Sequence, residues 1–108
     1  MMTTKHMLLA SALLGSFPVA FAQDKEMKEL LQASGCMSCH AIDEKVVGPA
    51  FQAIAAKYKG QADAVDTLTQ SVRNGSRGKW GRTPMPPHSS LSGDDLKKLT
   101  TWVLAQKP

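Results

Sequence analysis

The chain has 108 residues, which leaves room for one domain. Its formal net charge is +4, and 20% of its residues are charged. Its basic residues are scattered, without the dense runs that follow a phosphate backbone, which argues against nucleic-acid binding. Aromatic residues make up only 6% of the chain, which predicts a small hydrophobic core. A small domain with such a core is often stabilised by a covalent cross-link, a metal or a cofactor.

The N-terminal stretch predicts a cleaved signal peptide. Lys5 gives a positive start, residues 7–19 are apolar or small, and residues 20–22 have the small–large–small pattern of a cleavage site. The apolar run is too short and too interrupted for a permanent anchor, although a retained anchor is the alternative. We expect residues 1–22 to be the leader and residues 23–108 to be one periplasmic domain without stable membrane insertion.

The first two predicted helices lie on either side of a cysteine-containing segment. Residues 24–33 predict a short helix with Asp24 as its N-cap and Gly35 as its end. A second helix is expected to start at Pro49 and to end at Gly60. Their apolar stripes are Met27, Leu30 and Leu31 in the first, and Phe51, Ile54, Ala55 and Tyr58 in the second.

Two more helices are expected in the second half of the chain. Residues 64–73 predict a helix ended by Asn74 and Gly75. The three glycines and three prolines of residues 75–90 predict an irregular loop. Ser92, with Asp95 three residues later, predicts the capping box of a last helix. The expected core positions are Val65, Leu68 and Val72, then Leu96, Leu99 and Val103, with Trp102 beside them.

No segment alternates apolar and polar residues over a useful length, so the predicted fold class is all-α, with four to five short helices.

Cys36, Cys39 and His40 form a C-x-x-C-H pentapeptide, the pattern of covalent haem attachment. Two thiols at this spacing add across the two vinyl groups of one porphyrin, and the following imidazole then reaches the iron. A structural disulfide is the default for an exported cysteine pair, but here it would close too short a loop to remove much chain entropy. We therefore predict one covalent haem c with His40 as its proximal ligand.

Two other roles for the motif remain open. A redox dithiol would use His40 to lower the pKa of a thiol, but such motifs belong to a βαβ context that the helical pattern does not provide. A zinc site needs four ligands. Beyond the motif, the mature chain offers only His88 and carboxylates without suitable spacing.

Met85 is the expected second axial ligand. Met37 lies between the two cysteines and cannot turn back to the iron, and packing on a helical stripe explains Met27. Met85 has proline on both sides, and proline reduces the entropy lost when a loop is ordered. His88, three residues later, is the rival ligand, and two histidines would give a lower potential than histidine with methionine.

At this point the chain resembles the cytochrome c-551 (c8) family of class I c-type cytochromes. The segments that carry the resemblance span nearly all of the mature chain, in matching order and spacing. They are residues 35–43, 47–51, 74–76, 78–81, 84–87 and 102–104.

The resemblance implies the compact class I fold, with helices around one covalently bound haem. It implies His40 and Met85 as axial ligands, and a Pro49 carbonyl that accepts a hydrogen bond from the His40 ring. It also implies that the Trp80 indole N–H reaches a haem propionate.

Two positions depart from the family pattern. Some relatives have an arginine near a propionate where this chain has Ser71, and Arg73 is a candidate to replace its charge. Relatives often have asparagine at the position of His88, near the methionine ligand. A histidine there would make the reduction potential pH-dependent if it is coupled to the iron.

The predicted function is single-electron transfer, because both axial positions are filled and no site is open to a substrate. We expect no enzymatic activity, and a monomer that carries electrons between donors such as the bc1 complex and terminal reductases or oxidases such as nitrite reductase. Acidic partners would dock against Lys45, Lys57 and Lys79. The alternatives are a thiol–disulfide enzyme, a haem sensor or small peroxidase with a labile methionine, and a subunit of a larger haem enzyme.

Overall fold

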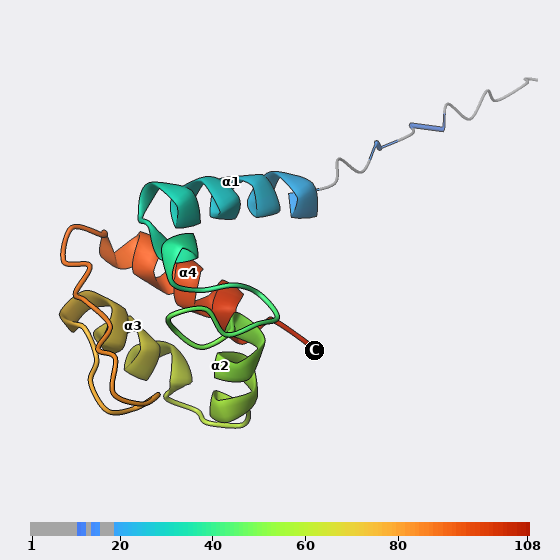
Figure 1. The fold of residues 1–108 in the computed structure, drawn as a ribbon. Helices are drawn as coiled ribbons and strands as arrows, with labels where there is room; N and C mark the ends of the chain where they lie inside the picture. Colours follow the sequence, from blue (N-terminus) through green and yellow to red (C-terminus); the bar gives the residue numbers. More distant parts are fainter. Residues whose placement is uncertain (1–10, 13, 16–18) are drawn as a thin grey trace, which may run out of the picture.

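The computed structural model describes residues 11, 12, 14, 15 and 19–108, so the predicted signal peptide falls mainly outside the described residues. Within them the chain forms helices joined by loops (Figure 1), without a strand beyond isolated bridges. The all-α prediction is confirmed. The elements are α1 (Val19–Ala33), the 3-10 turn η1 (Cys36–Ser38), α2 (Phe51–Tyr58), α3 (Ala64–Asn74) and α4 (Gly93–Leu104).

Helix α1 begins at Val19, so the prediction that Asp24 caps it is wrong. Residues 19–23 contain no glycine or proline, and the helix therefore continues past Asp24 toward the N-terminus. At the other end Gly35 adopts φ 72°, as expected for a helix stop. Met27 and Leu31 are buried and Leu30 is partly buried. No helix in the described part of the chain has the length and apolarity to cross a membrane.

Helix α2 begins at Phe51 with Ala50 as its N-cap, so Pro49 precedes the helix instead of starting it. Residue Ala50 has ψ 144°, an extended backbone value that the chain must leave before the first helical turn. Gly60 follows the helix with φ 80°, and the predicted apolar stripe of α2 is buried.

Helix α3 matches its predicted range apart from one added residue at its C-terminal end. Leu68 and Val72 are buried as expected. Ala64 occupies the third buried position, and Val65 is only half-buried. The small Ala64 side chain therefore replaces the predicted Val65 in the core.

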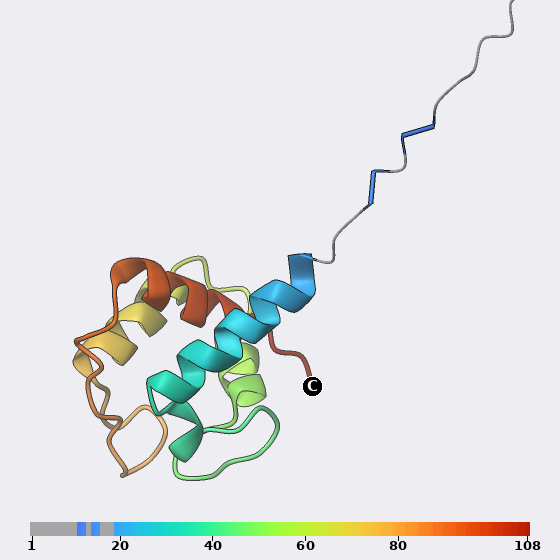
Figure 2. The same cartoon turned by 90° about the horizontal axis from the view of Figure 1, so that it is seen from above.

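Helix α4 packs against α1, α2 and α3 and forms the centre of the molecule (Figures 1 and 2). Ser92 caps it, because the Ser92 hydroxyl accepts the Asp95 backbone N–H at 3.1 Å. The predicted stripe of Leu96, Leu99 and Val103 is buried. Thr100 is also buried, and its hydroxyl donates to the Leu96 carbonyl at 2.8 Å, so no polar group is left unpaired there.

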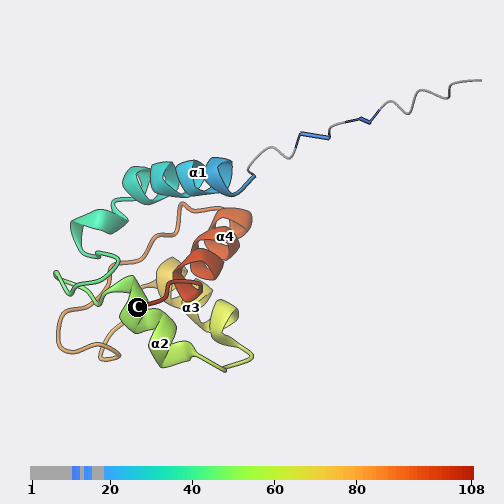
Figure 3. The same ribbon diagram turned by 90° about the vertical axis from the view of Figure 1, so that its right-hand side faces the viewer.

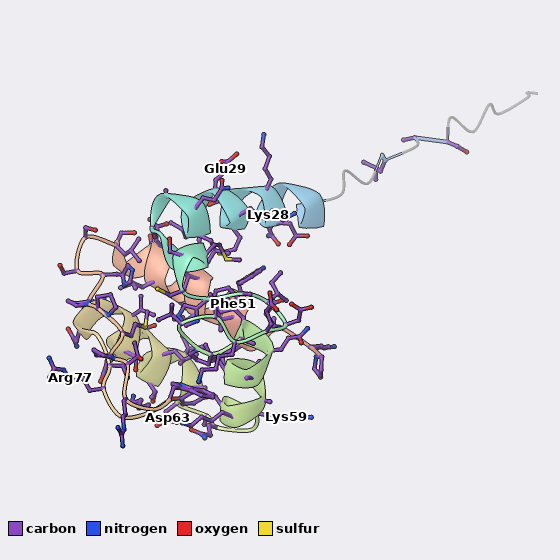
Figure 4. The ribbon with its side chains drawn as sticks, in the orientation of Figure 1. Lys28, Glu29, Phe51, Lys59, Asp63 and Arg77 are labelled. Carbon is purple, nitrogen blue, oxygen red and sulfur yellow. The ribbon has the colours of Figure 1, made fainter. Side chains whose placement is uncertain are left out.

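Two irregular segments, residues 39–50 and 75–90, lie together at one edge of the molecule, at the left of Figure 3. The second is closed into a loop by reciprocal backbone hydrogen bonds between Ser76 and Met85, at 3.0 and 2.8 Å. Arg77 projects from the outer side of this loop, whereas Phe51 lies inside the molecule at the start of α2 (Figure 4). The two segments form walls of the cavities described next.

Candidate functional site

Two cavities lie between the irregular segments and the helices. The larger, about 750 Å³ including space open to solvent, is bounded by residues 39–49, the 75–90 loop and α3. The smaller, about 390 Å³, is bounded by Cys36, Phe51 and apolar residues of α3 and α4. Side chains that line both cavities show that the two are adjacent. They are His40, Leu68, Val72 and Met85.

The two cysteines are held by the 3-10 turn that follows Gly35. The Cys36 carbonyl accepts the backbone N–H groups of Cys39 and His40 at 3.2 and 3.0 Å. Both thiols are free, with Cys36 on the wall of the smaller cavity and Cys39 on the wall of the larger one. Burial raises the pKa of the Cys36 thiol, which is opposite to what a redox-active thiolate requires.

His40 is oriented by a hydrogen bond and a stacked ring. Its Nδ1 lies 2.7 Å from the Pro49 carbonyl oxygen, which can only accept, so Nδ1 carries the proton and Nε2 keeps a lone pair. Its ring stacks on Phe51 at a centroid distance of 5.2 Å, and Phe51 meets Trp102 edge-on at 5.4 Å. The imidazole therefore borders both cavities in a defined tautomer, with an Nε2 lone pair of the kind that a metal ion needs.

Gly48 gives the His40 ring its space. A Cβ atom at Gly48 would lie 2.6 Å from Cε1 of His40 and 3.1 Å from its Nε2, well inside van der Waals contact. The sequence reasoning missed this role, because Gly48 looked like a loop glycine beside Pro49. The contact joins neighbours in space that no residue pattern reveals.

Met85 is positioned by its pairing with Ser76. The close approach depends on Gly75, where φ is 78° and an added Cβ would lie 2.7 Å from the Met85 carbonyl oxygen. The Met85 side chain is half-buried and lines both cavities. Met85 and His40 thus reach the same space from two different segments.

The rival ligand His88 lines neither cavity. Its backbone N–H donates to the Val72 carbonyl at 2.8 Å, and its ring Nδ1 is buried without a hydrogen-bond partner. The geometry therefore favours Met85 over His88 as the residue that faces His40. Among residues 19–108, no three His, Cys, Asp or Glu side chains gather as metal ligands, which gives the zinc alternative no support.

Trp80, Lys79 and Ser71 line the larger cavity on the side of the 75–90 loop. Trp80 is 37% exposed, so one part of its ring faces solvent. Arg73, the residue considered as a replacement for an arginine at position 71, is exposed and lies outside the cavity wall. The sequence reasoning named Lys79 only as a docking residue and did not connect it with Ser71.

The residues present fit a covalently bound porphyrin. Two unbridged thiols, an imidazole with a free Nε2 and a thioether all border largely apolar, adjoining cavities. Thioether bonds need the two thiols, and a low-spin iron needs the two axial donors. An all-α fold with this donor set defines the class of c-type cytochromes.

The cytochrome c family model matches residues 25–107, and the chain belongs to that family. It is 50% identical over 88 residues to cytochrome c-551 of Pseudomonas aeruginosa, a match that covers 82% of each chain. It is 38% identical to cytochrome c-552 of Hydrogenobacter thermophilus, over 92% of this chain and 96% of that one. The crystal structure of Nitrosomonas europaea cytochrome c552 superposes with a TM-score of 0.72 at 42% identity, and covers 74% of this chain and 99% of that chain.

These similarities confirm the resemblance and the compact class I fold. The chain is a small c-type cytochrome with one covalent haem c, and it acts as an electron carrier and not as an enzyme. The thiol–disulfide enzyme considered from the sequence is therefore set aside.

Proposed function

We propose that the chain is a periplasmic single-electron carrier whose haem is attached through Cys36 and Cys39 and held between His40 and Met85. The observation that carries the proposal is the presence of His40 and Met85 on the walls of both adjoining cavities. Donors such as the bc1 complex would supply electrons to the monomeric mature chain, residues 23–108, after removal of the leader. Reductases or oxidases such as nitrite reductase would accept them.

When bound, the haem supplies a reversible one-electron change at its iron, and the protein supplies ligands, insulation and docking. The Pro49 carbonyl holds the proton on Nδ1 of His40, which keeps Nε2 directed toward the cavity. Met85 would supply the second axial ligand, and a thioether raises the potential relative to a second imidazole. With both positions taken by side chains, no coordination site is left for a substrate.

Exposed apolar side chains beside the cysteines support docking at this edge. Met37, Ile42 and Val46 are each 41–50% exposed and line neither cavity, although large apolar side chains usually avoid water. They adjoin Cys39 in the 36–50 segment. A partner that covers them would approach the thioether edge of the haem, where electrons enter and leave.

The test of the ligand assignment is Met85→Ala in the haem-loaded protein. We expect the weak long-wavelength iron–sulfur charge-transfer band to disappear and the midpoint potential to fall, because the thioether is lost. Absorption spectroscopy of the ferric protein and a redox titration measure the two effects.

Met37→Ala is the matched control, because Met37 is 43% exposed and lies between the two cysteines. Its band and potential are expected to stay near those of the parent protein. Persistence of the band in Met85→Ala would exclude Met85 as the ligand.

A further inference from the structure

A serine and a lysine from different segments meet at the wall of the larger cavity. The Lys79 Nζ donates to the Ser71 hydroxyl oxygen at 2.9 Å, and that hydroxyl donates onward to the Thr67 carbonyl at 3.1 Å. The hydroxyl proton is thus used within α3, and the oxygen is left as an acceptor for the lysine. Ser71 thereby places the Lys79 ammonium beside the cavity.

A second lysine holds the same stretch of the 75–90 loop. The Lys57 Nζ donates to the Lys79 carbonyl at 3.1 Å and lies 4.4 Å from the centroid of the Trp80 ring. The ring face attracts a cation at this distance. Helix α2 therefore contacts both Lys79 and Trp80 through Lys57, and helix α3 contacts Lys79 through Ser71.

The part of the cavity wall that holds Lys79 has no acidic residue. The residues that line the larger cavity include no aspartate or glutamate. The ion pairs found in the described residues join Lys25 to Glu29 and Lys98 to Glu26, both on other parts of the molecule. A lysine held at a cavity without a carboxylate of its own is suited to receive an anionic group of a ligand.

We propose that Lys79, positioned by Ser71 at the wall of the larger cavity, pairs with a haem propionate. Lys79 and Arg73 are both exposed, but Lys79 lines the larger cavity and Arg73 does not, so Arg73 does not have this role. Ser71 takes one of the three ammonium donors of Lys79, and two remain for a carboxylate. The inference rests on the proposed seating of the haem between His40 and Met85.

The test is the pH dependence of the midpoint potential in Lys79→Gln. A nearby cation favours the ionised carboxylate, so its removal raises the pKa of the propionate. The midpoint potential is expected to change with pH over the range in which the propionate ionises. We expect this step in the potential–pH curve to move upward by about one pH unit in the variant. The potential above the step is expected to fall, because one positive charge near the iron is lost.

Lys79→Arg keeps the charge and is expected to restore the parent curve. Arg73→Gln is the matched control, since it removes the same charge from an exposed position in the neighbouring helix, and its step is expected to stay in place. Ser71→Ala is expected to move the step in the direction of Lys79→Gln by a smaller amount, because the ammonium loses its anchor.

The iron–sulfur band and haem retention after denaturation are recorded for each variant. If both are intact and the step of Lys79→Gln is unmoved, or if Arg73→Gln moves it instead, the assignment of Lys79 is overturned while the proposed function stands. If the parent protein lacks the band, the seating of the haem is wrong, and the assignment falls with it.

Discussion

The environment of His40 shows how single residues determine the geometry of a proposed iron ligand. The Pro49 carbonyl fixes the protonated nitrogen, Phe51 stacks on one side of the ring, and Gly48 lies against it without a side chain. Each contact restricts a different motion: ring tautomer, tilt and translation. Together they fix the tautomer and the position of the imidazole.

Gly48→Ala tests this arrangement. Gly48 is not among the glycines with positive φ, so its backbone conformation is open to alanine, and the nearest atoms that the added methyl group meets belong to the His40 ring. We expect a loss of about 1–3 kcal/mol in the free energy of unfolding, typical of an overpacked site, together with a changed midpoint potential. Guanidinium unfolding and a redox titration of the haem-loaded protein measure both.

Gly93→Ala is the matched control for this substitution. Gly93 is the first residue of α4, and a Cβ there would meet nothing within 4 Å. Its free energy of unfolding is expected to stay level or to rise slightly, since alanine has less backbone entropy in the unfolded chain. Equal losses in the two variants would show that the His40 contact is not the cause.

At the level of elements, the sequence predicted most of the fold from stop residues and apolar stripes. Gly35, Gly60 and Gly75 follow helix ends and have positive φ. These ends could be predicted because a glycine stop depends only on residues near it in the sequence. The wrong predictions of helix bounds concern the N-terminal ends of α1 and α2. Asp24 had the right residue type for a cap, but residues 19–23 contain no helix breaker and α1 begins at Val19. Pro49 was predicted to start α2, but Ala50 is its N-cap and Phe51 its first residue.

The site could be predicted only in part. Cys36, Cys39 and His40 were identifiable because the chemistry sets their spacing, and Met85 because its flanking prolines are local. The contact of Lys79 with Ser71 was not, since it depends on how the 75–90 loop returns to α3. Side-chain contacts between distant segments leave no periodic signal in a single sequence.

The N-terminal cap of α4 matters beyond its own helix, because α4 packs against the other three helices of the described chain. Ser92→Ala removes the acceptor of the Asp95 backbone N–H. We expect a loss of about 1 kcal/mol in the free energy of unfolding, measured by guanidinium denaturation. Ser90→Ala, at an exposed turn residue, is the control and is expected to change little. An equal loss there would assign the effect to the turn and not to the cap.

For the whole molecule, charge is distributed unevenly around the site. Lys5 carries the only formal charge in residues 1–22, so the proposed mature chain keeps a net charge of +3. The cationic Lys79 lies at the larger cavity, with Lys57 bound to its carbonyl. Lys45 is exposed and pairs through its backbone with His40. Between α1 and α4, by contrast, the Lys98 ammonium pairs with the Glu26 carboxylate, whose hydrogen bond and charge raise the pKa of Lys98.

This distribution predicts that an anionic redox partner is steered toward the haem edge. Oxidation of the reduced protein by ferricyanide is expected to slow several-fold between about 0.1 and about 1 M salt, as the Debye length falls from about 10 to about 3 Å. Stopped-flow absorption measures the rate. Lys45→Gln and Lys97→Gln lower the net charge equally, but Lys97 lies on α4 beside α1. A weaker salt dependence in Lys45→Gln alone would come from local steering. Equal effects in both variants would show that the net charge alone determines the salt dependence. They would exclude steering of the partner to this edge.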